Sequence, residues 1–290
     1  MSVSVDTIVP ARRRRQSFTG ITGVLPFVAI FVIFVLFAIF APWIAPQDPN
    51  TQNLFGRLKP PGTTARNVFY LLGTDNLGRD LLSRLIYGAR ISLSVAVLSV
   101  CLSGITGTVL GMAAGLARGW TEIVIMRLVE IVLSVPAVLL AIIMVAVLGP
   151  GFTNVVLVLA LTRWPRYARV AFGQALSVAN MPYVRLARFM GAGTFRILFV
   201  HILPNIVGAI TVVATLEFGL MVLFEASLSF LGLGVQPPTP SWGAMLSTGR
   251  AYVATAWWIA AFPGACLFFL VLSVNLIGDF LRDRLDPKSR

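Results

Sequence analysis

The chain has 290 residues, of which 57% are hydrophobic and only 12% are charged, and its mean hydropathy is +0.87. Soluble domains carry about a quarter charged residues, so this composition excludes an ordinary soluble enzyme, a disordered chain and a disulfide scaffold. The formal charge of +12 does not indicate a nucleic-acid partner, because the basic residues flank apolar runs, as the positive-inside rule for membrane proteins describes.

Apolar runs of about 20 residues, each long enough to cross a bilayer, recur along the chain. The first follows Arg12–Arg15 and is too long for the apolar region of a signal peptide, so we predict an uncleaved first helix. The fourth run is apolar only as far as Thr162, and we expect its helix to continue past the interface with Arg163, Arg166 and Arg169 snorkelling. The sequence predicts an all-α polytopic membrane protein with six transmembrane helices at residues 25–44, 91–117, 123–148, from about 152, 205–230 and 257–281.

Six spans place both termini on one side of the membrane. The segments on that side hold 16 of the 23 basic residues, and the opposite segments hold 7, which predicts cytoplasmic termini. The predicted organisation is a cytoplasmic tail at 1–24, a first transmembrane helix at 25–44, an outer loop at 45–90 with an interfacial helix, a five-helix core at 91–281 with a cytoplasmic loop at 172–204, and a second cytoplasmic tail at 282–290.

The second span carries glycines on one helical face. Gly107, Gly111 and Gly115 form a G-x-x-x-G-x-x-x-G pattern, and small residues of this kind let two helix backbones approach closely in lipid. The pattern is consistent with packing inside one subunit and with packing against a partner subunit. We expect the former.

The segment 163–201 has six arginines and no acidic residue. Asn180 is a candidate cap for a short helix that opens with Met181-Pro182. The spacing predicts one apolar face, and Gly191 and Gly193 end the helix before Thr194 caps a second one. The face comprises Tyr183, Leu186, Ala187 and Met190. Such a helix either docks on a partner or lies on the lipid surface.

Three stretches of the sequence carry a family resemblance. RLARFMGAGTFRILFVHILP resembles the "EAA" loop of bacterial ABC importer permeases: Ala187, Gly191, Leu203 and Pro204 match the pattern, whereas Arg185, Leu186 and His201 depart from it. LLGTDNLGRDLLSRLIYGARISL and EASLSFLGLGVQPPTPSWGAML are similar to the C-type subunits of dipeptide and oligopeptide permeases. Nickel and glutathione permeases share these signatures.

The resemblance implies a type I ABC importer permease in a bacterial inner membrane. It implies a heterodimer with a second homologous permease subunit, two cytoplasmic ATPases that bind ATP and Mg, and an extracytoplasmic binding protein. The 172–204 loop would then be the coupling loop, and its helix would dock on an ATPase rather than on lipid. The resemblance assigns ATPase coupling to Tyr183, Arg185, Leu186, Ala187, Arg188, Met190, Gly191, Leu203 and Pro204.

Acidic residues in or near spans must face a partner or water, because an isolated charge there is costly. Glu130 lies three residues after Arg127, a spacing that predicts a local ion pair. Glu217 is a candidate pathway residue, with a buried inter-helix hydrogen bond as the other interpretation. Glu225 is a second pathway candidate, or it ties down the loop that follows it.

Asp75, Arg79 and Asp80 precede the second span, and Trp242 lies in the Pro-rich outer loop after the fifth span. We expect these four residues either to contact the binding protein or to lie at the lipid headgroups.

The sequence shows no phosphate-binding G-x-x-x-x-G-K-[ST] loop, so we expect no ATP hydrolysis, no catalytic residues and no cofactor in this chain. One His and two isolated Cys predict no metal site. Two rival functions remain: a permease for nickel, glutathione or another small solute, and a secondary transporter that needs no ATPase. The second rival would require inverted repeats with broken helices, and none is visible in the sequence.

Overall fold

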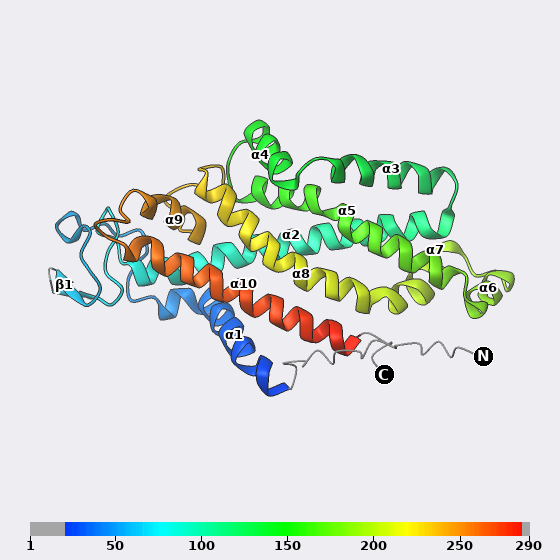
Figure 1. The fold of residues 1–290 in the computed structure, drawn as a ribbon, viewed down its shortest axis with the longest axis horizontal. Helices are drawn as coiled ribbons and strands as arrows, with labels where there is room; N and C mark the ends of the chain where they lie inside the picture. The colour runs from blue at the N-terminus through cyan, green and yellow to red at the C-terminus, as the bar shows by residue number, and fades with distance from the viewer. Residues whose placement is uncertain (1–20, 66, 286–290) are drawn as a thin grey trace, which may run out of the picture.

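Long helices make up most of the protein in the computed structural model, which describes residues 21–65 and 67–285 (Figure 1). The predicted tails at 1–24 and 282–290 lie largely outside these residues. The main helices are α1 (Ile21–Ile44), α2 (Leu81–Ala117), α3 (Trp120–Ser134), α4 (Ala137–Leu148), α5 (Phe152–Ala179), α8 (Leu203–Phe230) and α10 (Trp258–Leu285). The shorter elements are η1 (Leu54–Gly56), β1 (Thr63–Ala65), β2 (Val68–Tyr70), α6 (Pro182–Phe189), α7 (Thr194–Arg196), the π-helical η2 (Ile197–Ile202) and α9 (Trp242–Arg250).

Four described helices are long and apolar enough to cross a membrane, and the bent pair α3–α4 makes a fifth span if it counts as one. α5 has 28 residues, enough for a sixth span, and it carries the three arginines noted above. The structure is therefore the all-α membrane bundle that the sequence predicts. Among the described residues the only sheet is the short antiparallel hairpin β1–β2, in which Thr63 pairs with Tyr70.

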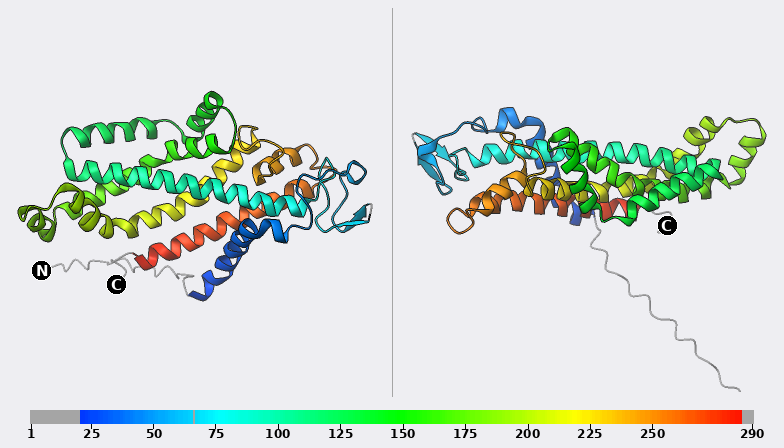
Figure 2. Two further views of the ribbon diagram at one scale, coloured as in Figure 1. Left: turned by 180° about the vertical axis from the view of Figure 1, so that it is seen from behind. Right: turned by 90° about the horizontal axis from the view of Figure 1, so that it is seen from above.

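The bundle is elongated, and its two ends differ (Figures 1 and 2). The β1–β2 hairpin and α9 lie at one end, called the hairpin end below, and α6 lies at the opposite end, called the α6 end. α2, α5, α8 and α10 run lengthwise between the two ends, and α3 lies alongside α5.

The glycine face of α2 packs against α5 within the same chain. A Cβ added at Gly111 would lie 2.8 Å from the Ala171 Cβ, and one at Gly115 would lie 2.9 Å from the Ala175 Cβ. One at Gly107 would collide with the backbone oxygen of Trp164. Only glycine allows this approach, so the intra-subunit interpretation of the G-x-x-x-G pattern is confirmed.

The second helix begins ten residues earlier than predicted, at Leu81 rather than residue 91. The Asp80 carboxylate accepts hydrogen bonds from the backbone N–H and the hydroxyl of Ser83, and it caps the helix. The amphipathic stretch predicted as a separate interfacial helix is therefore the approach to α2 and its first turns. Charged residues near Leu81 made the sequence there unlike an apolar span, so the start of the helix was not predicted. Tertiary contacts described below pair these charges.

The third predicted span is not one straight helix. α3 and α4 meet at a bend of 92°. Pro136 disfavours helical geometry at the residue before it, and Val135 is extended, with φ −97° and ψ 134°. The predicted 123–148 span was wrong in this respect: the apolar run continues through the break, but the backbone does not.

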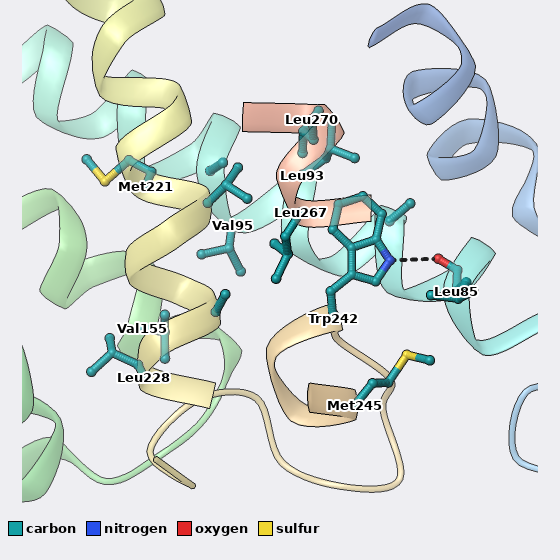
Figure 3. Close-up of a cluster of buried hydrophobic side chains, with 14 of the residues drawn as sticks. Leu85, Leu93, Val95, Val155, Met221, Leu228, Trp242, Met245, Leu267 and Leu270 are labelled. Carbon is teal, nitrogen blue, oxygen red and sulfur yellow. Dashed lines mark hydrogen bonds between the residues drawn. The ribbon is translucent and has the colours of Figure 1, made fainter. Parts of the chain in front are cut away.

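The main core lies toward the hairpin end and contains a buried tryptophan (Figure 3). Trp242, at the start of α9, is 0% exposed, and its Nε1 donates a hydrogen bond of 3.0 Å to the Leu85 carbonyl of α2. Phe34 of α1 meets the indole edge to face at 5.3 Å between ring centroids. Met221 and Leu267 bring α8 and α10 into the same cluster. This cluster joins α1, α2, α8, α9 and α10.

Candidate functional site

The α6 end presents an exposed apolar surface on a short helix. Val184 is fully buried and packs with the cluster that includes Ile197 and Ile202, so one side of α6 is anchored. The other side is open: the exposed fractions are 44% for Tyr183, 60% for Leu186, 88% for Phe189 and 81% for Met190. Arg185 and Arg188 are also exposed, and Ala187 is half-buried. The predicted apolar face is thus mostly open, and Val184, which the sequence reasoning omitted, anchors it.

The caps of this segment differ from the predictions. The α6 N-cap is Met181 rather than Asn180, whose side chain bonds instead to the Leu176 carbonyl behind it and to Arg185. Gly193 precedes the next helix, and Thr194 is its first residue rather than its cap. Gly191 has a φ of +86°, a value that suits glycine in a turn.

The turn after α6 leads without interruption into a long helix. α7, η2 and α8 form one helical run of 37 residues from Thr194 to Phe230, and Leu203 and Pro204 lie at the start of α8. The Tyr183 and His201 rings lie 6.3 Å apart between centroids, which joins α6 to η2. Phe189 and Phe195, at 88% and 78% exposure, are two further exposed aromatics that the sequence reasoning missed. Phe189 falls outside the i, i+3, i+4 set that defined the face.

A buried charge cluster joins α5 to α8. Glu217, 2% exposed, accepts a hydrogen bond of 2.8 Å from the Arg163 Nε and one of 3.2 Å from the Arg166 Nη1. The Arg163 guanidinium also lies 4.8 Å from the centroid of the Phe224 ring. Arg163 therefore does not snorkel as predicted, because Glu217 meets it inside the bundle. Glu217 does make a buried inter-helix hydrogen bond, and because the donor is Arg163 the contact is also an ion pair.

A groove of about 490 Å³ opens beside this cluster. Arg166, Arg169 and Glu217 supply its polar lining, and Leu133, Val170, Val213 and Leu216 supply the apolar part. Glu217 thus reaches the groove while it remains paired.

Glu225 lies deeper in the bundle and bonds to hydroxyl groups. Its carboxylate accepts a hydrogen bond of 2.9 Å from the Ser92 hydroxyl of α2 and one of 2.7 Å from the Ser229 hydroxyl of α8. The residue is 0% exposed. This arrangement joins two helices near the start of the loop before α9. It fits the interpretation of Glu225 as a tie rather than a pathway residue.

The four residues predicted to contact a binding protein are buried: Asp75 is 3%, Arg79 8%, Asp80 2% and Trp242 0% exposed. The Arg79 Nε donates a hydrogen bond of 2.6 Å to the Asp75 carboxylate, and the Arg84 Nε lies 3.5 Å from the same carboxylate. With so little surface, these side chains hold the hairpin end together, and the expectation of a contact at a partner or at lipid headgroups is corrected.

A smaller prediction concerns an exposed ion pair on α3. Arg127 and Glu130 do form the local ion pair, at 2.9 Å, with side chains 71% and 56% exposed. Among residues 21–65 and 67–285, no group of three His, Cys, Asp or Glu side chains is placed to hold a metal ion.

Comparisons with known proteins cover most of the chain. The family described as "Binding-protein-dependent transport system inner membrane component" matches residues 107–290, and "N-terminal TM domain of oligopeptide transport permease C" matches residues 27–61. The di/tripeptide transport system permease protein DppC of Pseudomonas aeruginosa is 48% identical over 86% of this chain and 82% of that protein. The glutathione transport system permease protein GsiD of Pectobacterium atrosepticum is 42% identical over 86% and 81%.

Solved structures agree on the fold. The inward-facing MetNI methionine ABC transporter matches with a TM-score of 0.56 at 18% identity, covering 71% of this chain and 98% of that one. An amino acid ABC transporter matches with a TM-score of 0.52 at 17% identity, covering 69% and 94%. From the family match over residues 107–290 and the identity to the curated permeases, the chain belongs to the family of binding-protein-dependent transport system inner membrane components.

Proposed function

We propose that this chain is the C-type permease subunit of an ABC importer for dipeptides and short oligopeptides. The observation that carries the proposal is the exposed apolar side of α6, anchored by Val184 and connected through η2 to α8. An apolar surface of this kind on a rigid helix fits a groove of a partner protein. The family membership and the peptide names of the relatives support the substrate class.

In this proposal α6 docks on a cytoplasmic ATPase, which binds ATP and Mg. A rigid-body movement of the ATPase would shift α6, and the continuous helix from Thr194 to Phe230 would carry the shift into the bundle. A second homologous permease subunit completes the pathway, and an extracytoplasmic binding protein delivers substrate at the hairpin end. The α6 end and both termini are cytoplasmic in a bacterial inner membrane.

Glutathione is the second candidate substrate, because the GsiD relative is 42% identical. Nickel is a further candidate substrate, because nickel permeases share the sequence signatures noted above. A comparison of uptake of an unmodified dipeptide, glutathione and Ni²⁺ by the reconstituted importer decides among the three.

The docking proposal is tested by placing a charge on the open side of α6. Phe189→Asp and Leu186→Asp should abolish ATP-driven uptake in reconstituted vesicles and weaken ATPase co-purification at least about tenfold, because the carboxylate would be desolvated without a partner. Phe69→Asp, which alters a residue 58% exposed on β2 at the hairpin end, is the matched control and should leave ATPase co-purification unchanged. Normal uptake in both α6 variants would contradict the docking surface.

The orientation has its own test. In a chain without Cys101 and Cys266, a cysteine introduced at Ala192 should react with a membrane-impermeant thiol reagent only from the cytoplasmic side. One introduced at Thr63 of β1 should react only from outside. Labelling of Ala192→Cys from outside would reverse the proposed orientation.

A further inference from the structure

The groove between α3, α5 and α8 carries more positive charge than it can neutralise within this chain. Arg163 and Arg166 share the single carboxylate of Glu217. Arg169 is exposed on the same lining and forms none of the ion pairs found among the described residues. The group of Arg163, Arg166, Arg169 and Glu217 therefore has a net charge of +2.

These arginines lie well along α5 from its first residue. At 1.5 Å per residue, Arg166 lies about 21 Å and Arg169 about 26 Å along α5 from Phe152. A bilayer has a hydrocarbon core of about 30 Å, so both positions fall within a membrane-spanning length of the helix. Unneutralised charge within a membrane span faces water or a charged partner, and the groove that opens beside these arginines favours water and a solute dissolved in it.

The two arginines are also well placed to act together. They are three residues apart on one helix, so their side chains project from the same face. The Arg166 side chain is 51% exposed even though its Nη1 bonds to Glu217, and this bond orients the guanidinium beside the groove. Arginine presents a planar fork of N–H donors that matches a carboxylate in geometry as well as in charge.

The remaining lining defines the chemistry of the ligand. Leu133, Val170, Val213 and Leu216 form an apolar wall beside the arginines. The volume of about 490 Å³ lies in the range of small-molecule sites, about 300–1,000 Å³. A molecule with a carboxylate next to an apolar group fits both parts of the lining.

We infer that this groove receives the carboxylate end of the transported solute, with Arg166 and Arg169 as its anion-binding residues and Glu217 as the residue that positions Arg166. The inference deepens the proposed function and rests on it, since a peptide brings a carboxylate and apolar side chains. Glu217 then acts through Arg166: because Arg163 neutralises its carboxylate, Glu217 does not itself bind the ammonium group of a peptide.

The test uses the assembled, nucleotide-free importer in lipid nanodiscs, with Cys101 and Cys266 replaced by Ala and Val213 replaced by Cys as a reporter in the groove. Two thiol reagents of similar size, anionic sulfonatoethyl methanethiosulfonate and cationic trimethylammonioethyl methanethiosulfonate, report the local charge. The anionic reagent should react faster. Replacement of both Arg166 and Arg169 by Gln should lower the ratio of the two rates about tenfold or more. Arg118→Gln, at the end of α2, is the control and should leave the ratio unchanged.

Protection by ligands then tests the carboxylate. Alanyl-phenylalanine and its N-acetyl derivative should both slow the labelling of Val213→Cys, whereas the C-terminal amide should protect several-fold less, and the Arg166→Gln/Arg169→Gln pair should remove this difference. Equal protection by the amide, or loss of protection on N-acetylation, would overturn the inference. If Val213→Cys is unreactive, protein covers the groove, and the inference is overturned. If labelling is slower in anionic than in neutral lipid, a lipid headgroup occupies the groove, and the inference is overturned as well. Failure of ATP-driven peptide uptake by the unsubstituted importer would contradict the proposed function instead, and the labelling ratios would still decide the groove.

Discussion

The two ends of the bundle use charged residues in opposite ways. At the hairpin end, Asp75 pairs with Arg79 and lies beside Arg84, Asp80 caps α2, and all four residues are at most 8% exposed. Toward the α6 end, Arg169, Arg185 and Arg188 are exposed beside exposed apolar side chains. The four charged residues of the hairpin end are thus paired or hydrogen-bonded within one chain. The second end leaves surface that only a partner, a solute or water can satisfy, and the proposed docking surface and the inferred groove both lie there.

The largest expected effect concerns the scaffold at the hairpin end. Trp242→Ala would remove a fully buried indole, its hydrogen bond to the Leu85 carbonyl and its contact with Phe34. Substitutions of this kind cost about 3–5 kcal/mol, and thermal unfolding of the detergent-solubilised complex measures the loss. Trp43→Ala is the matched control, because Trp43 is 78% exposed, and it should change the unfolding temperature little. Equal effects of the two changes would break the contrast between a buried scaffold residue and an exposed one.

The second prediction concerns the ion pair between the two regions. Glu217→Gln keeps the size of the side chain but leaves Arg163, 4% exposed, without a counter-charge. Loss of one partner of a buried pair costs about 3–5 kcal/mol, and the remaining amide oxygen favours the lower end of that range. The free energy of unfolding of the purified complex should fall accordingly.

The double variant Arg163→Gln/Glu217→Gln sharpens this result. It removes both buried charges, so its stability should recover much of the loss of the single change. A single variant that unfolds like the parent would show that water already solvates Arg163. In that case the pair would belong with the open surface and not with the scaffold.

The third prediction concerns the close approach of α2 and α5. Gly111→Ala would place a methyl group 2.8 Å from the Ala171 Cβ and nearer still to the Ala168 carbonyl oxygen, so the helices must separate. Overpacking of this type costs about 1–3 kcal/mol, seen as a lower unfolding temperature. Gly173→Ala on α5 is the control: apart from its chain neighbours and its own helix backbone, no heavy atom lies within 4 Å of the added Cβ, and alanine favours a helix by about 0.5–1 kcal/mol. Destabilisation at Gly173 rather than at Gly111 would contradict the packing.

Local patterns in the sequence predict the structure wherever residues close together in the chain determine it. The apolar runs predict α1, α8 and α10 to within a few residues, and the glycine spacing predicts the helix face that contacts α5. The short helix after Met181 is also a local feature, since Pro182 suits a first turn. These features depend on neighbours three or four residues away, which the sequence displays directly.

The sequence does not predict contacts between residues that lie far apart in the chain. The indole of Trp242 bonds to Leu85, 157 residues away, and the carboxylate of Glu217 bonds to Arg163, 54 residues away. A tryptophan in an outer loop and an arginine in a span therefore read as interfacial residues until the fold buries them. For Asp75 and Arg79, the i, i+4 spacing that allows an ion pair is visible in the sequence, but the burial of the pair is not.

The smallest expected effect concerns the exposed counterpart of the Glu217 pair. Arg127 and Glu130 lie on α3 at i, i+3, with a distance of 2.9 Å, close to the 2.8 Å of the buried pair, but with side chains 71% and 56% exposed. Because both side chains are open in this chain, we expect water to solvate both charges when the pair is broken, and surface pairs on a helix contribute only about 0.3–0.5 kcal/mol. Arg127→Gln should therefore shift the unfolding temperature much less than Glu217→Gln does, and raised salt should reduce even that shift. A loss as large as that of Glu217→Gln would mean that a partner subunit buries this face of α3, and the comparison of the two pairs would then report the assembly rather than the single chain.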